Sequence, residues 1–137
     1  MILNELTPRA LSGANEAAGE GPVVMVNLLW FRPTPLYPDG FEGAKASSRE
    51  AYYIAYASAI RAVAVELGVS MELVYAGDRR CSVLAEPDDD WDDIVMVRYG
   101  SLQDLRRILE SEAYRQNAAP HRLAAIANWR FFATASK

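Results

Sequence analysis

The chain of 137 residues contains one histidine, and its position suits proton transfer. His121 directly follows Pro120, at the start of a predicted short helix. In the first turn of a helix, the dipole and the free backbone N–H groups disfavour an imidazolium, so the ring is expected to be neutral. A neutral imidazole suits a general base, which makes His121 the candidate catalytic residue. The same position equally suits a structural hydrogen bond between the helix start and a strand end.

Two polar residues stand in otherwise apolar predicted strands. Asn27 is the polar member of the run VVMVNLLWF, on the face assigned to the interior, and a buried amide without partners costs roughly 1 to 3 kcal/mol. Its partner is either a ligand or a neighbouring group. Arg98 shares a strand face with Ile94 and Met96. It either reaches into the cavity as an anion anchor or pairs with an acid at a dimer seam, because a buried guanidinium needs a partner.

Tyrosine hydroxyls and a second arginine complete the candidate substrate-binding set. Tyr52, Tyr56 and Tyr99 are placed where their hydroxyls could meet a cavity rim, although tyrosines at helical spacing also serve as ordinary core residues. Arg122 follows the histidine and pairs either with an acid or with substrate. The predicted substrate-binding residues are therefore Asn27, Arg98, Tyr56, Tyr99 and Arg122.

The acidic stretch EPDDDWDD, residues 86–93, invites a metal-binding interpretation because hard cations take carboxylate oxygens. Its spacing lacks the glycine and the distal glutamate of an EF-hand, so a solvated turn is predicted and no metal site. One histidine and one cysteine do not make a zinc site, and a nucleophilic pair of Cys81 and His121 is not expected. Without a phosphate-cradling glycine loop either, no cofactor is expected.

The composition predicts one globular domain. A chain of this length buries roughly 65 to 70% of its unfolded surface, enough for one core, and half of its residues are hydrophobic. A net charge of −4 without a Lys/Arg cluster argues against nucleic acid and anionic membranes. The lone cysteine, the start MILNELTPRA and the short apolar runs predict a cytoplasmic protein without a membrane span.

The elements that position these residues follow from hydrophobic periodicity and turn chemistry. Thr7, Pro8 and Gly13 delimit a short helix in an N-terminal extension, residues 1–20. The first helix of the main domain begins at a capping box formed by Ser47 and Glu50, and it ends at Gly68. The remaining predicted helices are one that begins at Ser101 and a short one that begins at Pro120. Four strands are predicted at residues 21–31, at 70–77 continued by 80–86 after a bend, at 93–99 and at 128–134.

The order β α β β α β over residues 21–137 is that of a ferredoxin-like α+β fold with an antiparallel sheet and both helices on one face. The strand at 23–31 is apolar on both faces, so the uncovered face needs a second layer. Exposing about five such side chains would forgo roughly 1.5 to 3 kcal/mol each. A homodimer with sheet facing sheet is the simplest cover.

From Gly21 onward, the chain resembles the bacterial domain of unknown function 1330 family of the dimeric α+β barrel superfamily. The resemblance is carried by GPVVMVNLLWF, EAYYIAYASAI, VYAGD, WDDIVMVRYGS and SEAYRQNAAPHRLAAIANWRFF. Gly100, Ala113 and Trp30 depart from the family pattern at helix starts and a strand end. The resemblance implies a homodimer whose two sheets close a barrel, and it implies no agreed reaction. The wider superfamily includes cofactor-free monooxygenases, isomerases, haem enzymes and binding proteins.

Two functions follow from these expectations. The first is a cofactor-independent enzyme acting on a small organic molecule, with His121 as proton acceptor and Asn27 or Arg98 steadying developing negative charge. The second is a non-catalytic small-molecule-binding or dimerisation module with the same apolar pocket. The scarcity of titratable groups weighs against the first.

Overall fold

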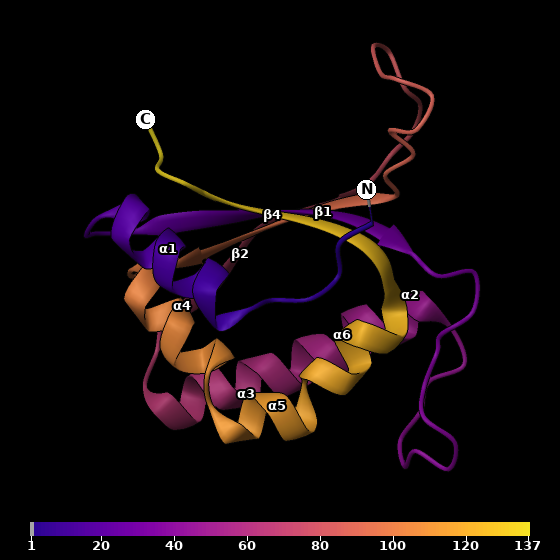
Figure 1. Ribbon diagram of the computed structural model, residues 1–137, viewed down its shortest axis with the longest axis horizontal. Coiled ribbons are helices and arrows are strands. Elements are labelled where there is room, and N and C mark those ends of the chain that lie inside the picture. The colour runs from indigo at the N-terminus through magenta and orange to yellow at the C-terminus, as the bar shows by residue number, and fades with distance from the viewer. Residues whose placement is uncertain (1) are drawn as a thin grey trace.

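The computed structural model describes residues 2–137. In chain order the elements are α1 (Pro8–Ala18), β1 (Val23–Phe31), α2 (Ser48–Glu50), the π-helical turn η1 (Ala51–Tyr56), α3 (Ala57–Leu67), β2 (Met71–Asp78), β3 (Asp93–Tyr99), α4 (Leu102–Leu109), α5 (Glu112–Asn117), α6 (Ala119–Ala125) and β4 (Ile126–Thr134). Figure 1 shows the helices from α2 to α6 gathered on one side of the sheet.

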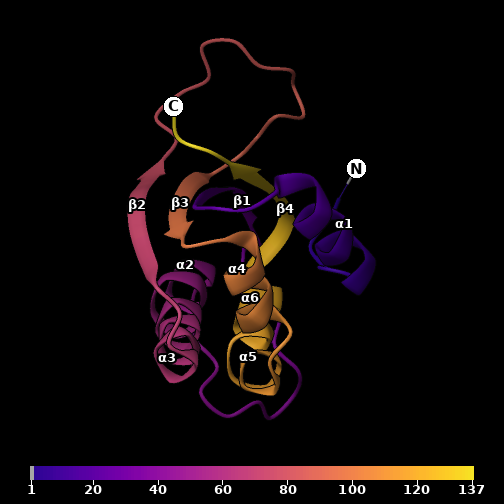
Figure 2. The same cartoon turned by 90° about the vertical axis from the view of Figure 1, so that its left-hand side faces the viewer.

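The four strands form one sheet in the order β2-β3-β1-β4, and every neighbouring pair is antiparallel. Figure 2 shows the strands side by side above the helix layer, with α1 beside β4 at the sheet edge. This topology is the ferredoxin-like α+β fold, which confirms the predicted fold class.

Three of the predicted helix ends are confirmed, and one is wrong. Ser47 Oγ accepts a hydrogen bond from the backbone N–H of Glu50, and Gly68 ends α3 in the left-handed region at φ 68°. Thr7 caps α1 as predicted, but the predicted stop at Gly13 is wrong, because α1 continues to Ala18. One glycine costs a helix only about 1 kcal/mol, which the alanines that follow it offset.

The strand predicted at residues 80–86 is wrong. After Asp78, residues 79–92 form a loop that rises from the side of the sheet opposite the helices (Figure 1). β2 lies at the sheet edge and has a pairing partner only on its β3 side, so its pairing stops where β3 begins at Asp93. Val83 and Leu84 in this loop are 95% and 98% exposed.

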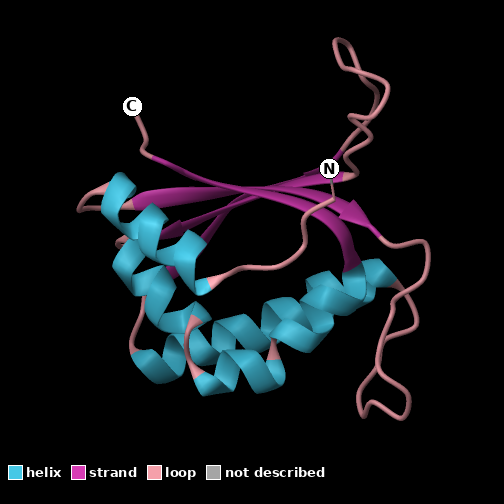
Figure 3. Cartoon of the chain, in the orientation of Figure 1, coloured by secondary structure: helices cyan, strands magenta, loops and turns pink. Residues whose placement is uncertain are grey.

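The two faces of the sheet are both apolar, as the sequence indicates, but only one is covered. The residues of β1 that face the helices, such as Met25 and Leu29, are buried in the main core. The opposite face, which we call the outer face, presents Val26, Leu28 and Phe132, and Phe132 is 51% exposed. Figure 3 shows no helix on that side of the sheet within residues 2–137.

None of the helices described between residues 2 and 137 has the length and apolarity that crossing a bilayer requires.

Candidate functional site

A cavity of about 170 Å³ lies between the sheet and the helical segment formed by η1 and α3. An apolar cavity of roughly 150 Å³ is large enough for a benzene-sized molecule. Its walls are mostly aliphatic and aromatic, and its polar groups are an asparagine, an arginine and a set of tyrosines. The lining residues include Met25, Asn27, Tyr52, Tyr53, Tyr56, Ala57, Ile60, Arg61, Val95, Val97, Tyr99, Trp129 and Phe131.

The π-helical turn η1 supplies three of the tyrosines that line this cavity, Tyr52, Tyr53 and Tyr56. Single π-helical turns inside α-helices are rare and occur often at functional sites. The hydroxyl of Tyr56 lies 2.8 Å from that of Tyr114 on α5, and this pair is buried. The wider i→i+5 turn is a local feature that hydrophobic periodicity alone does not predict.

Two tyrosine hydroxyls on the cavity wall, those of Tyr52 and Tyr99, form no hydrogen bond within the described residues 2–137. Every fully buried side-chain nitrogen or oxygen in that range has a partner, so these two hydroxyls are not fully buried, and both residues line the cavity. Burial raises the pKa of both tyrosines far above physiological pH. Both side chains are therefore neutral hydrogen-bonding groups available to a ligand.

Asn27 lines the same cavity, and most of its hydrogen-bonding capacity is used by neighbours. Its Nδ2 donates to the carbonyl of Val95 at 3.1 Å, and its Oδ1 accepts from Trp129 Nε1 at 2.9 Å. The predicted need for a partner is met inside the chain. One N–H of the amide remains for a ligand.

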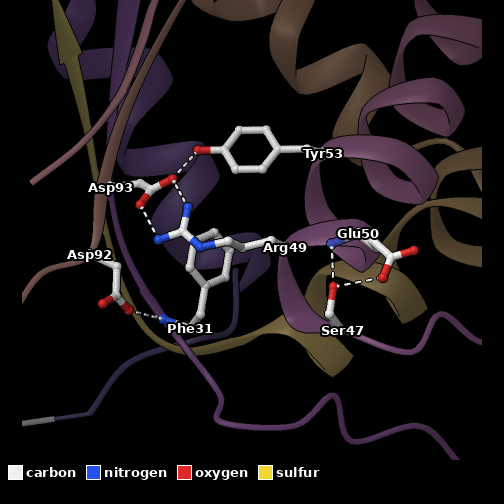
Figure 4. A network of polar contacts seen from close by, with 7 residues as sticks. All are labelled: Phe31, Ser47, Arg49, Glu50, Tyr53, Asp92 and Asp93. Atoms are coloured by element: carbon white, nitrogen blue, oxygen red, sulfur yellow. Dashed lines mark hydrogen bonds and ion pairs between the residues drawn. The ribbon is translucent and has the colours of Figure 1, made fainter.

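An ion pair between Asp93 and Arg49 lies next to Tyr53, one of the tyrosines that line the cavity (Figure 4). Both carboxylate oxygens of Asp93 accept from the guanidinium of Arg49 at 2.8 Å, and the hydroxyl of Tyr53 donates to the same carboxylate. The Asp93 side chain is 2% exposed, whereas that of Arg49 is 51% exposed. Burial, followed by the hydrogen bond to Asp93, raises the pKa of Tyr53.

This ion pair does not follow from the interpretation of the acidic run 86–93 as a solvated turn, although Asp93 is also the first residue of the strand predicted at 93–99. Asp93 begins β3 as the strand predicted at 93–99 indicates, and it shares the buried face of β3 with Val95 and Val97. The alternation of β3 is the signal that could have found it. Asp92 also has a structural role, because its carboxylate accepts from the backbone N–H of Phe31 at 2.8 Å.

Tyr56 and Tyr99 lie at the predicted cavity, but Arg98 does not. Arg98 points to the outer face of the sheet, where it pairs with Glu72 of β2. The prediction that Arg98 lines the cavity is therefore wrong. Both faces of β3 are apolar, so the sequence pattern does not show which face packs against the helices.

His121 also lies outside the cavity. Its Nδ1 is 2.7 Å from the Tyr37 hydroxyl, and its ring makes edge contacts with Tyr37 and Phe41 of the loop after β1. Burial, with a smaller contribution from the charge of Lys45, lowers the pKa of His121. The predicted neutral ring agrees with this direction, but the histidine links α6 to a loop and does not face the residues expected to share its site.

Arg122 is buried beneath the N-terminal segment. Its Nε donates to the hydroxyl of Tyr114 at 3.1 Å and its Nη1 to the backbone carbonyl of Asn4 at 2.7 Å. The guanidinium carbon lies 4.8 Å from the ring centroid of Trp129. No acidic side chain pairs with it within residues 2–137, so the expected acid partner is not found there.

In the described range 2–137, no three His, Cys, Asp or Glu side chains lie close enough together to hold a metal ion. Cys81 is exposed in the loop 79–92.

Two solved structures resemble this chain along almost its whole length. The crystal structure of RPA0582 from Rhodopseudomonas palustris, a protein of unknown function, is 26% identical with a TM-score of 0.80, covering 98% of this chain and 96% of that chain. The crystal structure of methylated RPA0582 is also 26% identical, with a TM-score of 0.82 and coverage of 98% and 95%. The chain matches no family model and no curated protein.

Proposed function

We propose that this protein binds a compact, uncharged, largely apolar molecule in the cavity between the sheet and the segment η1–α3. The observation that carries the proposal is the pair of hydroxyls of Tyr52 and Tyr99, which have no partner in residues 2–137 and line an otherwise mostly apolar cavity. Ligand sites typically combine apolar walls with a few placed polar groups. A phenol-sized ligand with one hydroxyl or carbonyl group fits this chemistry.

Binding without turnover fits the arrangement better than catalysis. The tyrosines that line the cavity have raised pKa values, so they are poor proton acceptors at neutral pH. Asp93 is committed to Arg49 and Tyr53. His121, the general base of the enzymatic hypothesis, lies outside the cavity against Tyr37.

The test compares phenol with toluene, a probe of the same size that lacks the hydroxyl, by NMR titration of the labelled protein. At roughly −0.7 kcal/mol per atom, a seven-atom ligand gains about −5 kcal/mol, a Kd of about 0.2 mM. Phenol should bind several-fold more tightly than toluene, and Tyr52→Phe combined with Tyr99→Phe should remove that difference. Equal binding of the two probes to the unmodified protein would refute the proposal.

A matched pair of substitutions on the same helical segment locates the ligand. Ala57 lines the cavity and Ala55 does not. Ala57→Leu should abolish phenol binding and Ala55→Leu should leave it unchanged. Conversion of a bound compound, followed by NMR over hours, would instead favour the enzymatic hypothesis.

We also propose that the protein is a homodimer of the dimeric α+β barrel type, as the resemblance to the domain of unknown function 1330 family implies. The second copy would cover the outer face, where Ile94 is 37% and Phe132 51% exposed. The loop 79–92 supports this, because it rises on the same side of the sheet (Figure 1) and contains the exposed residues Val83 and Leu84. Contiguous apolar patches of this kind mark interaction surfaces.

Phe132→Glu tests the dimer by sedimentation velocity at micromolar concentration. The unmodified protein should sediment as a dimer and the variant as a folded monomer, because a carboxylate would be buried in the interface without a partner. Leu36→Glu, at an exposed apolar residue of the loop after β1, is the control and should remain dimeric. A monomeric unmodified protein would refute the proposal.

A further inference from the structure

A second cavity, of about 360 Å³, lies between the N-terminal segment and the helices α4 to α6. Its apolar wall comes from Leu6 and Leu11 on one side and Leu109 and Ala119 on the other. Arg122 and the Tyr114 hydroxyl stand in its polar wall. This volume lies within the range of sites for small organic ligands, roughly 300 to 1,000 Å³.

The charge of Arg122 is what distinguishes this cavity. The residue is 5% exposed, and its hydrogen bonds within residues 2–137 go to two neutral oxygens, the Tyr114 hydroxyl and the Asn4 carbonyl. A buried guanidinium without a counter-charge is costly, because it has lost water and gained no anion. An anion in the cavity would supply the missing charge.

The geometry of the guanidinium leaves a donor for that anion. The bonds to Tyr114 and Asn4 use Nε and Nη1, and Nη2 has no partner within residues 2–137. Because every fully buried side-chain nitrogen in that range has a partner, Nη2 keeps accessible surface, and the residue lines this cavity. An almost fully buried arginine that lines the cavity therefore keeps one pair of N–H groups that no other group of residues 2–137 uses.

The other charges of the cavity leave Arg122 as its main anion-binding group. Glu110 pairs with Arg106 at 2.7 Å, and the exposed Arg115 pairs with Glu112. Arg122 thus contributes one positive charge without an acidic partner, and the opposite wall is aliphatic. This combination favours a ligand with a single negative charge and an apolar body over a compact, strongly hydrated anion such as phosphate.

We propose that the cavity beneath the N-terminal segment binds a small carboxylic acid with an apolar body. Its carboxylate accepts hydrogen bonds from Arg122, and its apolar body packs against Leu6, Leu11 and Leu109. The site is separate from the cavity proposed for the uncharged ligand and does not depend on it.

Isothermal titration of the full chain at pH 7 tests the proposal with three probes: hexanoate, hexanamide and inorganic phosphate. Hexanoate should bind at least about 10-fold more tightly than hexanamide, which has the same shape without the charge, and phosphate should show no competition. Equal binding of the acid and the amide, or displacement of hexanoate by phosphate at comparable concentration, would overturn the proposal.

Substitutions place the ligand within the chain. Arg122→Met should lower hexanoate affinity at least 10-fold, while Arg107→Met, which removes a charge from α4 outside the cavity, should not. Leu11→Trp should fill the cavity from the side of α1 and abolish hexanoate binding while Arg122 stays unchanged. This variant therefore tests the location of the ligand even if Arg122→Met fails to fold. Ala17→Trp, on the exposed side of α1, is its control. Hexanoate binding that survives Leu11→Trp would refute the proposed location, and Ala57→Leu in the first cavity should leave it unchanged.

Discussion

The ion pair between Asp93 and Arg49 allows a quantitative prediction about how the candidate site is held together. Removing one partner of a buried ion pair typically costs about 3 to 5 kcal/mol. Arg49 is half-exposed and regains water, and Asp93→Asn keeps the shape and one acceptor oxygen, which reduces the cost. We therefore expect Asp93→Asn to lower the free energy of unfolding by about 2 to 3 kcal/mol, a decrease in Tm of roughly 10 °C for a domain of this size.

A double-mutant cycle, measured by urea denaturation with far-UV circular dichroism, shows whether the pair is responsible. Arg49→Met leaves the Asp93 carboxylate buried with Tyr53 as its remaining side-chain donor. In that background, Asp93→Asn removes an uncompensated charge and should be neutral or stabilising. Asp88→Asn in the loop 79–92 is the matched control, with an expected effect below about 0.5 kcal/mol. If the effects of Asp93→Asn and Arg49→Met simply add, the reasoning about this ion pair is wrong.

Two further predictions concern other contacts. Burial lowers the folded-state pKa of His121, so protons bind the unfolded chain more tightly; the free energy of unfolding should fall as pH drops below about 6.5. In His121→Gln, the free energy of unfolding should depend less on pH between pH 7 and pH 5.5, as measured by denaturation curves. An unchanged pH dependence in the variant would mean that other groups cause the decline. Asn27→Leu removes the acceptor of Trp129 Nε1 and should cost about 2 kcal/mol in urea denaturation, so an unchanged midpoint would show that the hydrogen bond contributes little.

The fold could be predicted because its signals are local and agree with one another. Ser47 and Ser101 cap helices at the predicted positions, and Gly68 ends α3 in the left-handed region, which glycine adopts without the steric cost of a side chain. The apolar pattern of β1 indicated that both faces of the sheet are apolar; the helices bury one face, and the cover expected for the other stays a prediction. The run at residues 80–86 has the composition of a strand but no neighbouring strand to pair with, which composition does not reveal.

The site could be predicted only in part, because adjacent residues on one element point to different surroundings. His121 and Arg122 follow one another on α6, yet the histidine contacts the loop after β1 and the arginine lies under the N-terminal segment. Arg98 shares a face of β3 with Ile94 and Met96, as predicted, but this face is the outer face of the sheet and not the one that lines the cavity. Which face meets the helices is decided by packing over the whole sheet.

The N-terminal segment explains how a buried guanidinium is retained in so small a domain. Leu3 extends the hydrogen bonding of β4, because its N–H donates to Asn128 Oδ1 at 2.9 Å and its carbonyl accepts from Trp129 N at 2.6 Å. This pairing brings the Asn4 carbonyl onto Arg122. Residues 1–20 are predicted to be an extension of the main domain. In agreement with this, no residue of α1 is buried in the core.

The contacts of Leu3 with β4 and of Asn4 with Arg122 make the extension part of the wall around Arg122. They cover Arg122 with a neutral carbonyl where an acidic side chain would have neutralised it, and they leave the adjacent cavity open. Replacing a buried charge with a packed apolar residue is often neutral or stabilising, so stability alone does not favour an arginine here. A chain that places an uncompensated positive charge beside an apolar cavity has the two components that recognition of an apolar acid requires.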